Sequence, residues 1–499
     1  MTGRRWVQAG VGLAGAVGLG LPVEALARPD SGEGLFTFDA SDVLDHWDVP
    51  DAPVRVHFST DGPNVTRMDD ADEDGVPDFV HTIGTEVATV LEFYEAEGFR
   101  PPLFEADVGL GPLGGSAALD VYLVDFGGSS DGHYGIDGCR SGVCAGHLVI
   151  ENDFSGYGYS SPEAAAVVLA SHELFHGVQY AYTDDLDPWF SEGTATWAEH
   201  LYHPEVEDYL RFCTAYMADI GRSIDRPPAG TVTAFSYGTA LYFGFLQEQL
   251  GADTMVEMMD LLADAGDGDE MAAIQTAVAD AGGDFSSLWV TFMTWNLGTG
   301  PRGGLIESYP YYEGLWPGVD PEISGSAIID DNRFYPLAAT YFRLDHGGGE
   351  LLLGVGEDNH EAVVFQVHPT AGSGKVLDPL LTWSPDVQAV ESLGDQEAGT
   401  YWLLGTFPEA AAESEKRLFC FGGPDDMADC TPEAPEPEDT GDVPEPDDTG
   451  DDTPSSDDPD GSGSDGSGDT DKGGCATVAP LASMYLVWLP VLAVARRRR

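Results

Sequence analysis

The chain has 499 residues, of which 87 are acidic and 21 basic, so its formal net charge is −66 at pH 7. This length allows two or three domains with cores of their own. So acidic a chain repels phosphate backbones and anionic lipid, which excludes nucleic acid as a partner and fits an exported protein that binds divalent cations.

The first 27 residues are typical of a secretory signal. Arg4 and Arg5 precede a small-residue apolar stretch that ends in the A-x-A cleavage pattern of residues 25–27. We therefore expect the mature chain to begin near Arg28. The arginine pair leaves both the general and the twin-arginine export routes open.

An acidic loop, "DDADEDGVPD" over 69–78, is the next feature along the chain. Alternating carboxylates around a glycine turn can wrap a hard cation such as Ca²⁺. The candidate ligands are Asp70, Asp72, Asp74 and Asp78, although the twelfth position of an EF-hand would be His81 here rather than glutamate. A solvated turn remains the alternative in a chain this rich in aspartate.

The pattern of the remaining folded part predicts an α+β protein. Segment 78–97 places apolar residues on one helical face, 118–126 and 146–154 are typical of buried strands, and 162–300 is almost entirely helical by spacing. After about residue 325 short strands alternate with Gly- and Pro-rich turns. We therefore expect a mixed sheet followed by a helical subdomain over 28–315, and a β-sandwich over 322–422.

The segment "LASHELFHGVQYAY", residues 169–182, carries the clearest chemical signal. Ser161, Pro162 and Glu163 predict a helix start just before it. His172 and His176 then lie one turn apart on one face and can bind one zinc ion, while Glu173 can address a water beside it. The alternative is a helix with two ordinary core histidines.

A catalytic zinc site needs a third protein ligand and an open position. The segment "PWFSEGTATWAEH" predicts a second helix that can return Glu192, sixteen residues after His176, to the histidine pair. Glu199 lies two turns further along the same face and can hold a ligand histidine by its other ring nitrogen. A solvated surface position is the alternative for Glu199.

H-E-x-x-H followed by W-x-x-E-G-x-A resembles the gluzincin metallopeptidases, the thermolysin and aminopeptidase-N group, over about residues 150–300. The resemblance implies that His172, His176 and Glu192 bind zinc and that Glu173 is the general base. It also suggests Tyr237, in "FSYGTALYFGF", as the donor to the oxyanion, with core packing as the alternative.

The aminopeptidases' G-x-M-E-N box is missing, which favours an endopeptidase. We expect the strand over 146–154 to border the cleft and to offer a free edge to an extended peptide. A wider resemblance to secreted metalloproteases of myxobacteria rests on "DGVPDFV", "EGFRPP", "IENDF", "HELFHGVQ" and "WFSEGTATW" in that order. Those proteins are known mainly from their sequences, so this resemblance supports fold and site more than substrate.

The cysteines and the C-terminal region fit a protein outside the cell. Cys139 with Cys144 and Cys420 with Cys430 can each close a local disulfide, whereas Cys213 is expected to be a buried thiol. Residues 423–474 form an acidic linker without a core. Residues 475–499, a cysteine, an apolar run and four arginines, resemble myxobacterial sorting tags and predict a membrane anchor before processing and display at the cell surface.

These features together predict a surface-displayed zinc peptidase that acts on a protein or peptide. The alternative from another class is a calcium-stabilised adhesin with a structural metal site. Hydrolysis of a bond other than a peptide bond is a third possibility that the ligand set leaves open.

Overall fold

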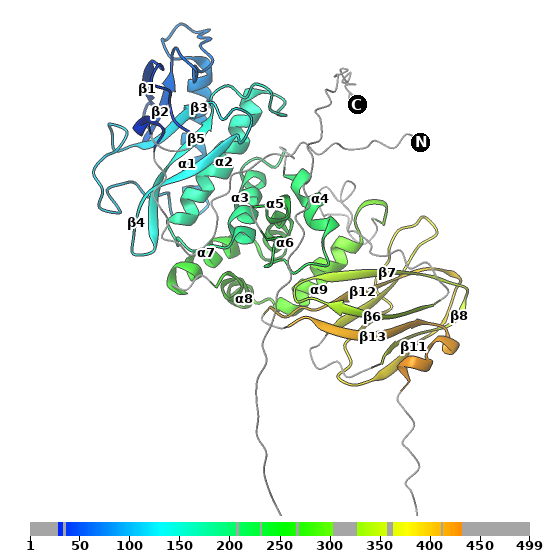
Figure 1. The fold of residues 1–499 in the computed structure, drawn as a ribbon. Helices are drawn as coiled ribbons and strands as arrows, with labels where there is room; N and C mark the ends of the chain where they lie inside the picture. The colour runs from blue at the N-terminus through cyan, green and yellow to red at the C-terminus, as the bar shows by residue number, and fades with distance from the viewer. Residues whose placement is uncertain are drawn as a thin grey trace, which may run out of the picture. The chain divides into compact units, whose positions relative to one another are not determined.

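The computed structural model describes residues 28–32, 36–205, 209–229, 232–265, 269–302, 327–356, 363–410 and 413–431 (Figure 1). The signal segment 1–27, the greater part of the linker and the tag 475–499 lie outside the described residues, and the statements about them stay predictions. Within the described ranges, no helix is long and apolar enough to cross a bilayer.

A five-stranded mixed sheet forms the first part of the fold, with the strand order β1-β2-β3-β5-β4. The neighbours β2, β3 and β5 are parallel, whereas β1 and β4 lie at the two edges and run antiparallel to the strands beside them. The strands are β1 (Leu44–Asp48), β2 (Val54–Ser59), β3 (Leu119–Val124), β4 (Gly132–Arg140) and β5 (Val143–Glu151).

The strand order corrects the prediction of a free edge on 146–154. This segment is mostly β5, which pairs with β3 on one side and β4 on the other. Eight of its nine residues are buried, because both faces of the strand are covered. The free edge near the helices belongs to β4 instead.

Two helices, α1 (Asp78–Ala96) and α2 (Pro162–Tyr180), pack on one face of this sheet. As predicted, Ser161 caps α2 by accepting a hydrogen bond from the Ala164 amide, and Pro162 is its first residue. Phe36 and Phe38 of the N-terminal segment cluster on the opposite face with side chains of β3 and β5.

The helical region follows as predicted, with seven further helices among the described residues. Cys213 is a buried free thiol in this region. The helices are α3 (Pro188–Tyr202), α4 (Leu210–Ala218), α5 (Ala234–Gly238), α6 (Ala240–Leu250), α7 (Asp253–Ala265), α8 (Glu270–Asp280) and α9 (Phe285–Leu297).

The last part consists of two antiparallel sheets, β10-β9-β12-β7 and β11-β8-β13-β6, which share an apolar core as the predicted sandwich requires. The opposite side of β7 and β12 meets α9, where the Tyr341 hydroxyl donates to the Met293 carbonyl at 2.8 Å. The strands are β6 (Ile328–Phe334), β7 (Ala339–His346), β8 (Gly349–Val355), β9 (Val364–Pro369), β10 (Leu381–Trp383), β11 (Ala389–Gln396), β12 (Gly399–Thr406) and β13 (Glu415–Gly422).

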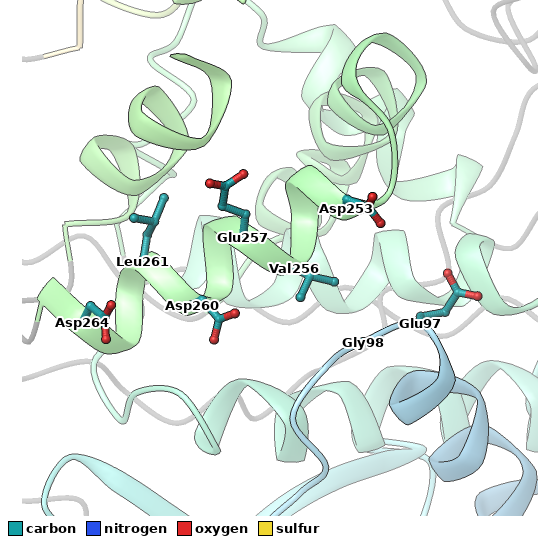
Figure 2. A pocket seen from close by; sticks show the side chains of 8 residues that line it. All are labelled: Glu97, Gly98, Asp253, Val256, Glu257, Asp260, Leu261 and Asp264. Carbon is teal, nitrogen blue, oxygen red and sulfur yellow. The ribbon is translucent and has the colours of Figure 1, made fainter. Parts of the chain in front are cut away.

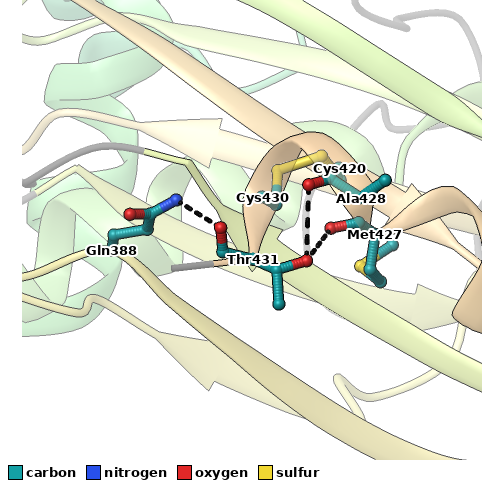
Figure 3. Close-up of a disulfide and its surroundings, with 6 residues drawn as sticks. All are labelled: Gln388, Cys420, Met427, Ala428, Cys430 and Thr431. Atoms are coloured by element: carbon teal, nitrogen blue, oxygen red, sulfur yellow. Dashed lines mark hydrogen bonds between the residues drawn. A yellow bond between two sulfur atoms is a disulfide. The ribbon is translucent and has the colours of Figure 1, made fainter. Parts of the chain in front are cut away.

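Both predicted disulfides are present. Cys139–Cys144 joins β4 to β5, and Cys420–Cys430 ties β13 to the 3₁₀ turn Ala428–Cys430. Figure 3 shows the second bond together with Thr431, whose hydroxyl donates to the Met427 carbonyl at 2.6 Å. Ordered chain therefore continues beyond residue 422, where the linker was expected to begin.

Candidate metal centre

Two neighbouring helices bring the three predicted zinc ligands together. His172 and His176 come from α2, and Glu192 comes from α3. One ligand atom from each side chain lies within 4.8 Å of the other two. The short loop between the helices returns α3 along α2, so the two histidines of α2 and Glu192 of α3 face a single point.

Glu192 Oε2 lies between the two imidazoles, 3.4 Å from His172 Nε2 and 3.6 Å from His176 Nε2. These distances are too long for good hydrogen bonds, and this buried oxygen has no other hydrogen-bond partner. The side chains are 9% (His172), 15% (His176) and 12% (Glu192) exposed, which leaves the site narrowly accessible.

Glu199 holds the first histidine, as its position on α3 predicts. Its Oε1 lies 2.7 Å from His172 Nδ1. Because an ionised carboxylate only accepts hydrogen bonds, Nδ1 must be the donor. The lone pair of a neutral His172 is then on Nε2, the atom that faces Glu192.

Gln179 holds the second histidine, a role that the sequence reasoning missed. Gln179 Oε1 lies 2.8 Å from His176 Nδ1. Its Nε2 donates to the Ser191 carbonyl at 2.7 Å and to Thr194 Oγ1 at 2.8 Å. The carbonyl accepts only, so the amide orientation is fixed and His176 Nδ1 must be the donor.

Both neutral imidazoles therefore present a lone pair to a carboxylate oxygen. Three acceptors at this spacing repel one another unless a cation or protons lie among them. Without a metal, protons on the histidine rings supply the positive charge. Burial lowers the pKa of His172 and of His176, but the nearby carboxylates of Glu192 and Glu173, and for His172 also that of Glu199, outweigh burial and raise the pKa of both. The donor set, two nitrogens and one carboxylate, is the one that a catalytic zinc site uses.

Glu173 lies next to this group on α2 without belonging to it. The residue is 5% exposed, and burial raises the pKa of its carboxyl group against the opposing charges of His172 and His176. Gly132, the first residue of β4, makes room for it. A Cβ at that position would lie 3.2 Å from Glu173 Cγ. The edge strand thus begins directly beside the proposed base.

Tyr237, on α5, also reaches the site. Its ring stacks on His172 with the ring centroids 5.8 Å apart, and Phe212 stacks on it at 4.8 Å. Burial raises the pKa of its hydroxyl far above the ordinary value, and the charges of Glu192 and Glu173 raise it further. A phenol that stays protonated in this position can donate a hydrogen bond at any physiological pH.

The acidic loop 69–78 brings together three of its four candidate ligands. Oxygen atoms of Asp70, Asp72 and Asp78 lie within 4.8 Å of one another. Asp74 is outside this group, and its Oδ1 accepts a hydrogen bond from the Val76 amide at 2.9 Å. Calcium binding by this loop remains a prediction.

A separate acidic cavity of about 490 Å³ lies where the end of α1 meets α7 (Figure 2). None of the predicted site residues lines it. Its walls carry the side chains of Glu97, Asp253, Val256, Glu257, Asp260, Leu261 and Asp264, with Gly98 at its edge.

Comparison with models of known protein families gives no match for this chain, and comparison with curated proteins gives no significant match. The case for a function therefore depends on the residues and geometry described above.

Proposed function

We propose that this protein is a zinc-dependent peptidase that hydrolyses peptide bonds with Glu173 as the general base. The observation that carries the proposal is the buried trio His172 Nε2, His176 Nε2 and Glu192 Oε2, which face one point at separations too long for good hydrogen bonds to one another. Glu199 and Gln179 fix both rings so that these lone pairs stay directed at that point.

The other residues of the site suit hydrolysis. When bound by the three ligands, Zn²⁺ would acidify a water molecule and polarise the substrate carbonyl. Glu173, on the same helix one residue after His172, would accept a proton from the attacking water and pass it to the leaving amine. Tyr237 would donate its hydroxyl to the developing oxyanion.

The edge strand supports a peptide as the substrate, and an endopeptidase in particular. β4 is at the end of the sheet, and its first residue, Gly132, lies so close to Glu173 that an added Cβ would come 3.2 Å from Glu173 Cγ. An extended peptide that adds to this edge through main-chain hydrogen bonds would pass the base. Such pairing needs no free substrate terminus.

The test compares wild type with Glu173→Gln on a library of fluorogenic peptides, and measures zinc content in both. We expect equal zinc content and a 10²- to 10⁴-fold lower kcat in the variant, the range for loss of a general base. A structural metal site in an adhesin predicts zinc in both proteins and turnover in neither. Zinc-dependent turnover of esters or amides but of no peptide would point to another hydrolase.

A further inference from the structure

A buried cluster on the far side of the sheet holds the guanidinium group of Arg28. The Arg28 side chain is 8% exposed. It faces three carboxylates that are themselves buried, with exposures of 5% (Glu105), 0% (Asp120) and 1% (Asp137). No residue of the proposed peptidase site takes part in this cluster.

All five N–H groups of the guanidinium have acceptors. Nε donates to Asp137 Oδ1 at 2.7 Å, and Nη2 donates to Asp137 Oδ2 at 2.5 Å and to Glu105 Oε1 at 2.8 Å. Nη1 donates to Asp120 Oδ2 and to the Tyr122 hydroxyl, the latter at 3.1 Å. An ammonium group has three donors and no planar fork, so it cannot replace this set.

The sheet builds this cluster from residues distant in sequence. Asp120 and Tyr122 lie on β3, and Asp137 lies in β4 where the register with β5 shifts between Ile136 and Gly138. A bulge of this kind redirects a side chain, here toward Arg28. Two further strands hold the carboxylates in place.

Two histidines on these further strands hold the carboxylates. His57 Nε2 on β2 lies 2.7 Å from Asp120 Oδ1, and His147 Nδ1 on β5 lies 2.9 Å from Asp137 Oδ1. These contacts hold Asp120 and Asp137 from strands other than the ones that carry them. The sheet thereby presents buried carboxylates to the Arg28 guanidinium.

We propose that this cluster is a guanidinium-specific site that holds the N-terminus of the mature protein through Arg28. Arg28 directly follows Ala27, the end of the predicted cleavage pattern. The residues after it belong to the fold, because the Phe38 amide donates to the Pro29 carbonyl at 3.0 Å and Phe38 packs beside Tyr122. The mature chain thus keeps every residue from Arg28 onward, and no propeptide is removed beyond it.

Thermal unfolding of full-length variants tests the specificity. We expect Arg28→Lys and Arg28→Gln to lower the unfolding temperature by similar amounts, about 5–10 °C, because both leave buried carboxylates without their partner. The matched controls are Arg100→Lys and Arg100→Gln, since Arg100 pairs with Asp260 at an exposed position. The controls should shift by less than about 2 °C. Full stability of Arg28→Lys would overturn the proposal.

Chemical rescue keeps the test decisive if these variants fold poorly. In Arg28→Gly, alone or with Asp137→Asn to reduce the unpaired charge, millimolar ethylguanidinium should raise the unfolding temperature and ethylammonium should not. Equal effects of the two cations, or no effect of either, would contradict a guanidinium site.

Mass spectrometry of the exported protein tests the second part of the proposal. The N-terminal peptide should contain Arg28. A mature chain that begins downstream of Arg28 would show that the site is dispensable. This result is independent of peptidase activity, so the proposed function and this inference can fail separately.

Discussion

Replacing Gln179 by methionine should weaken metal binding without touching a metal ligand. The side chains are of similar length, but methionine cannot accept the hydrogen bond of His176 Nδ1 or donate to the Ser191 carbonyl and Thr194. His176 would then lose the contact that fixes its ring and its tautomer. The change therefore separates the role of a residue that holds a ligand's ring from the role of the metal ligands themselves.

The size of the effect follows from these contacts. Three hydrogen bonds of 2.7–2.8 Å are lost, which should cost about 2–4 kcal/mol of stability in the metal-free protein. Loss of a residue that hydrogen-bonds to a metal ligand typically lowers metal affinity about 10- to 100-fold. We therefore expect a zinc affinity lower by about 1.4–2.8 kcal/mol, measured by competition with a chromophoric chelator.

Gln247→Met is the matched control. Gln247 also lies on a helix, and its Oε1 accepts a hydrogen bond from Trp197 Nε1 at 2.8 Å, away from both histidines. This variant should lose some stability and keep its zinc affinity. The reasoning is refuted if Gln179→Met binds zinc within twofold of wild type, or if the control loses as much affinity.

Three further predictions concern the oxyanion donor, stability and calcium. Tyr237→Phe should lower kcat about 10- to 10³-fold at unchanged zinc content, and an unchanged kcat would leave the tyrosine a packing residue. Burial raises the pKa of Glu270 to about 7 from 4.5, so its contribution to stability is full below about pH 4.5 and is lost as the pH rises through 7. In denaturant titrations, Glu270→Gln should therefore remove a fall in the free energy of unfolding of about 1.4 kcal/mol per pH unit between pH 5 and 7. Parallel pH dependences of wild type and variant would contradict this. Millimolar CaCl₂ should raise the unfolding temperature of wild type but not of Asp70→Asn with Asp78→Asn, whereas equal shifts would point to a solvated turn.

The local features of the fold could be predicted because they depend on neighbouring residues. The Ser161 cap, the apolar face of α1 and the one-turn spacing of His172 and His176 are all set within a few positions. The pairing of cysteines five and ten residues apart is similarly local. Glu192 and Glu199 could be placed because a short loop and helical spacing nearly determine where α3 returns.

Strand order and long-range polar contacts could not be predicted in the same way. The residues that hold Arg28 lie 77–109 positions away, and no spacing rule connects them. The lack of a regular apolar–polar alternation in β5 was a usable sign of a central strand, since both of its faces are buried. Gln179, three residues after His176 on the same helix face, was also within reach of helical spacing. Its bonds to Ser191 and Thr194, however, depend on the packing of α2 against α3.

Anomalous scattering at the zinc edge, from crystals grown with zinc, tests the central claim most directly. The account predicts one strong peak between His172 Nε2, His176 Nε2 and Glu192 Oε2, with both Nδ1 atoms still bonded to Glu199 and Gln179. A structure without that peak, in which protonated histidines bond directly to Glu192, would contradict it.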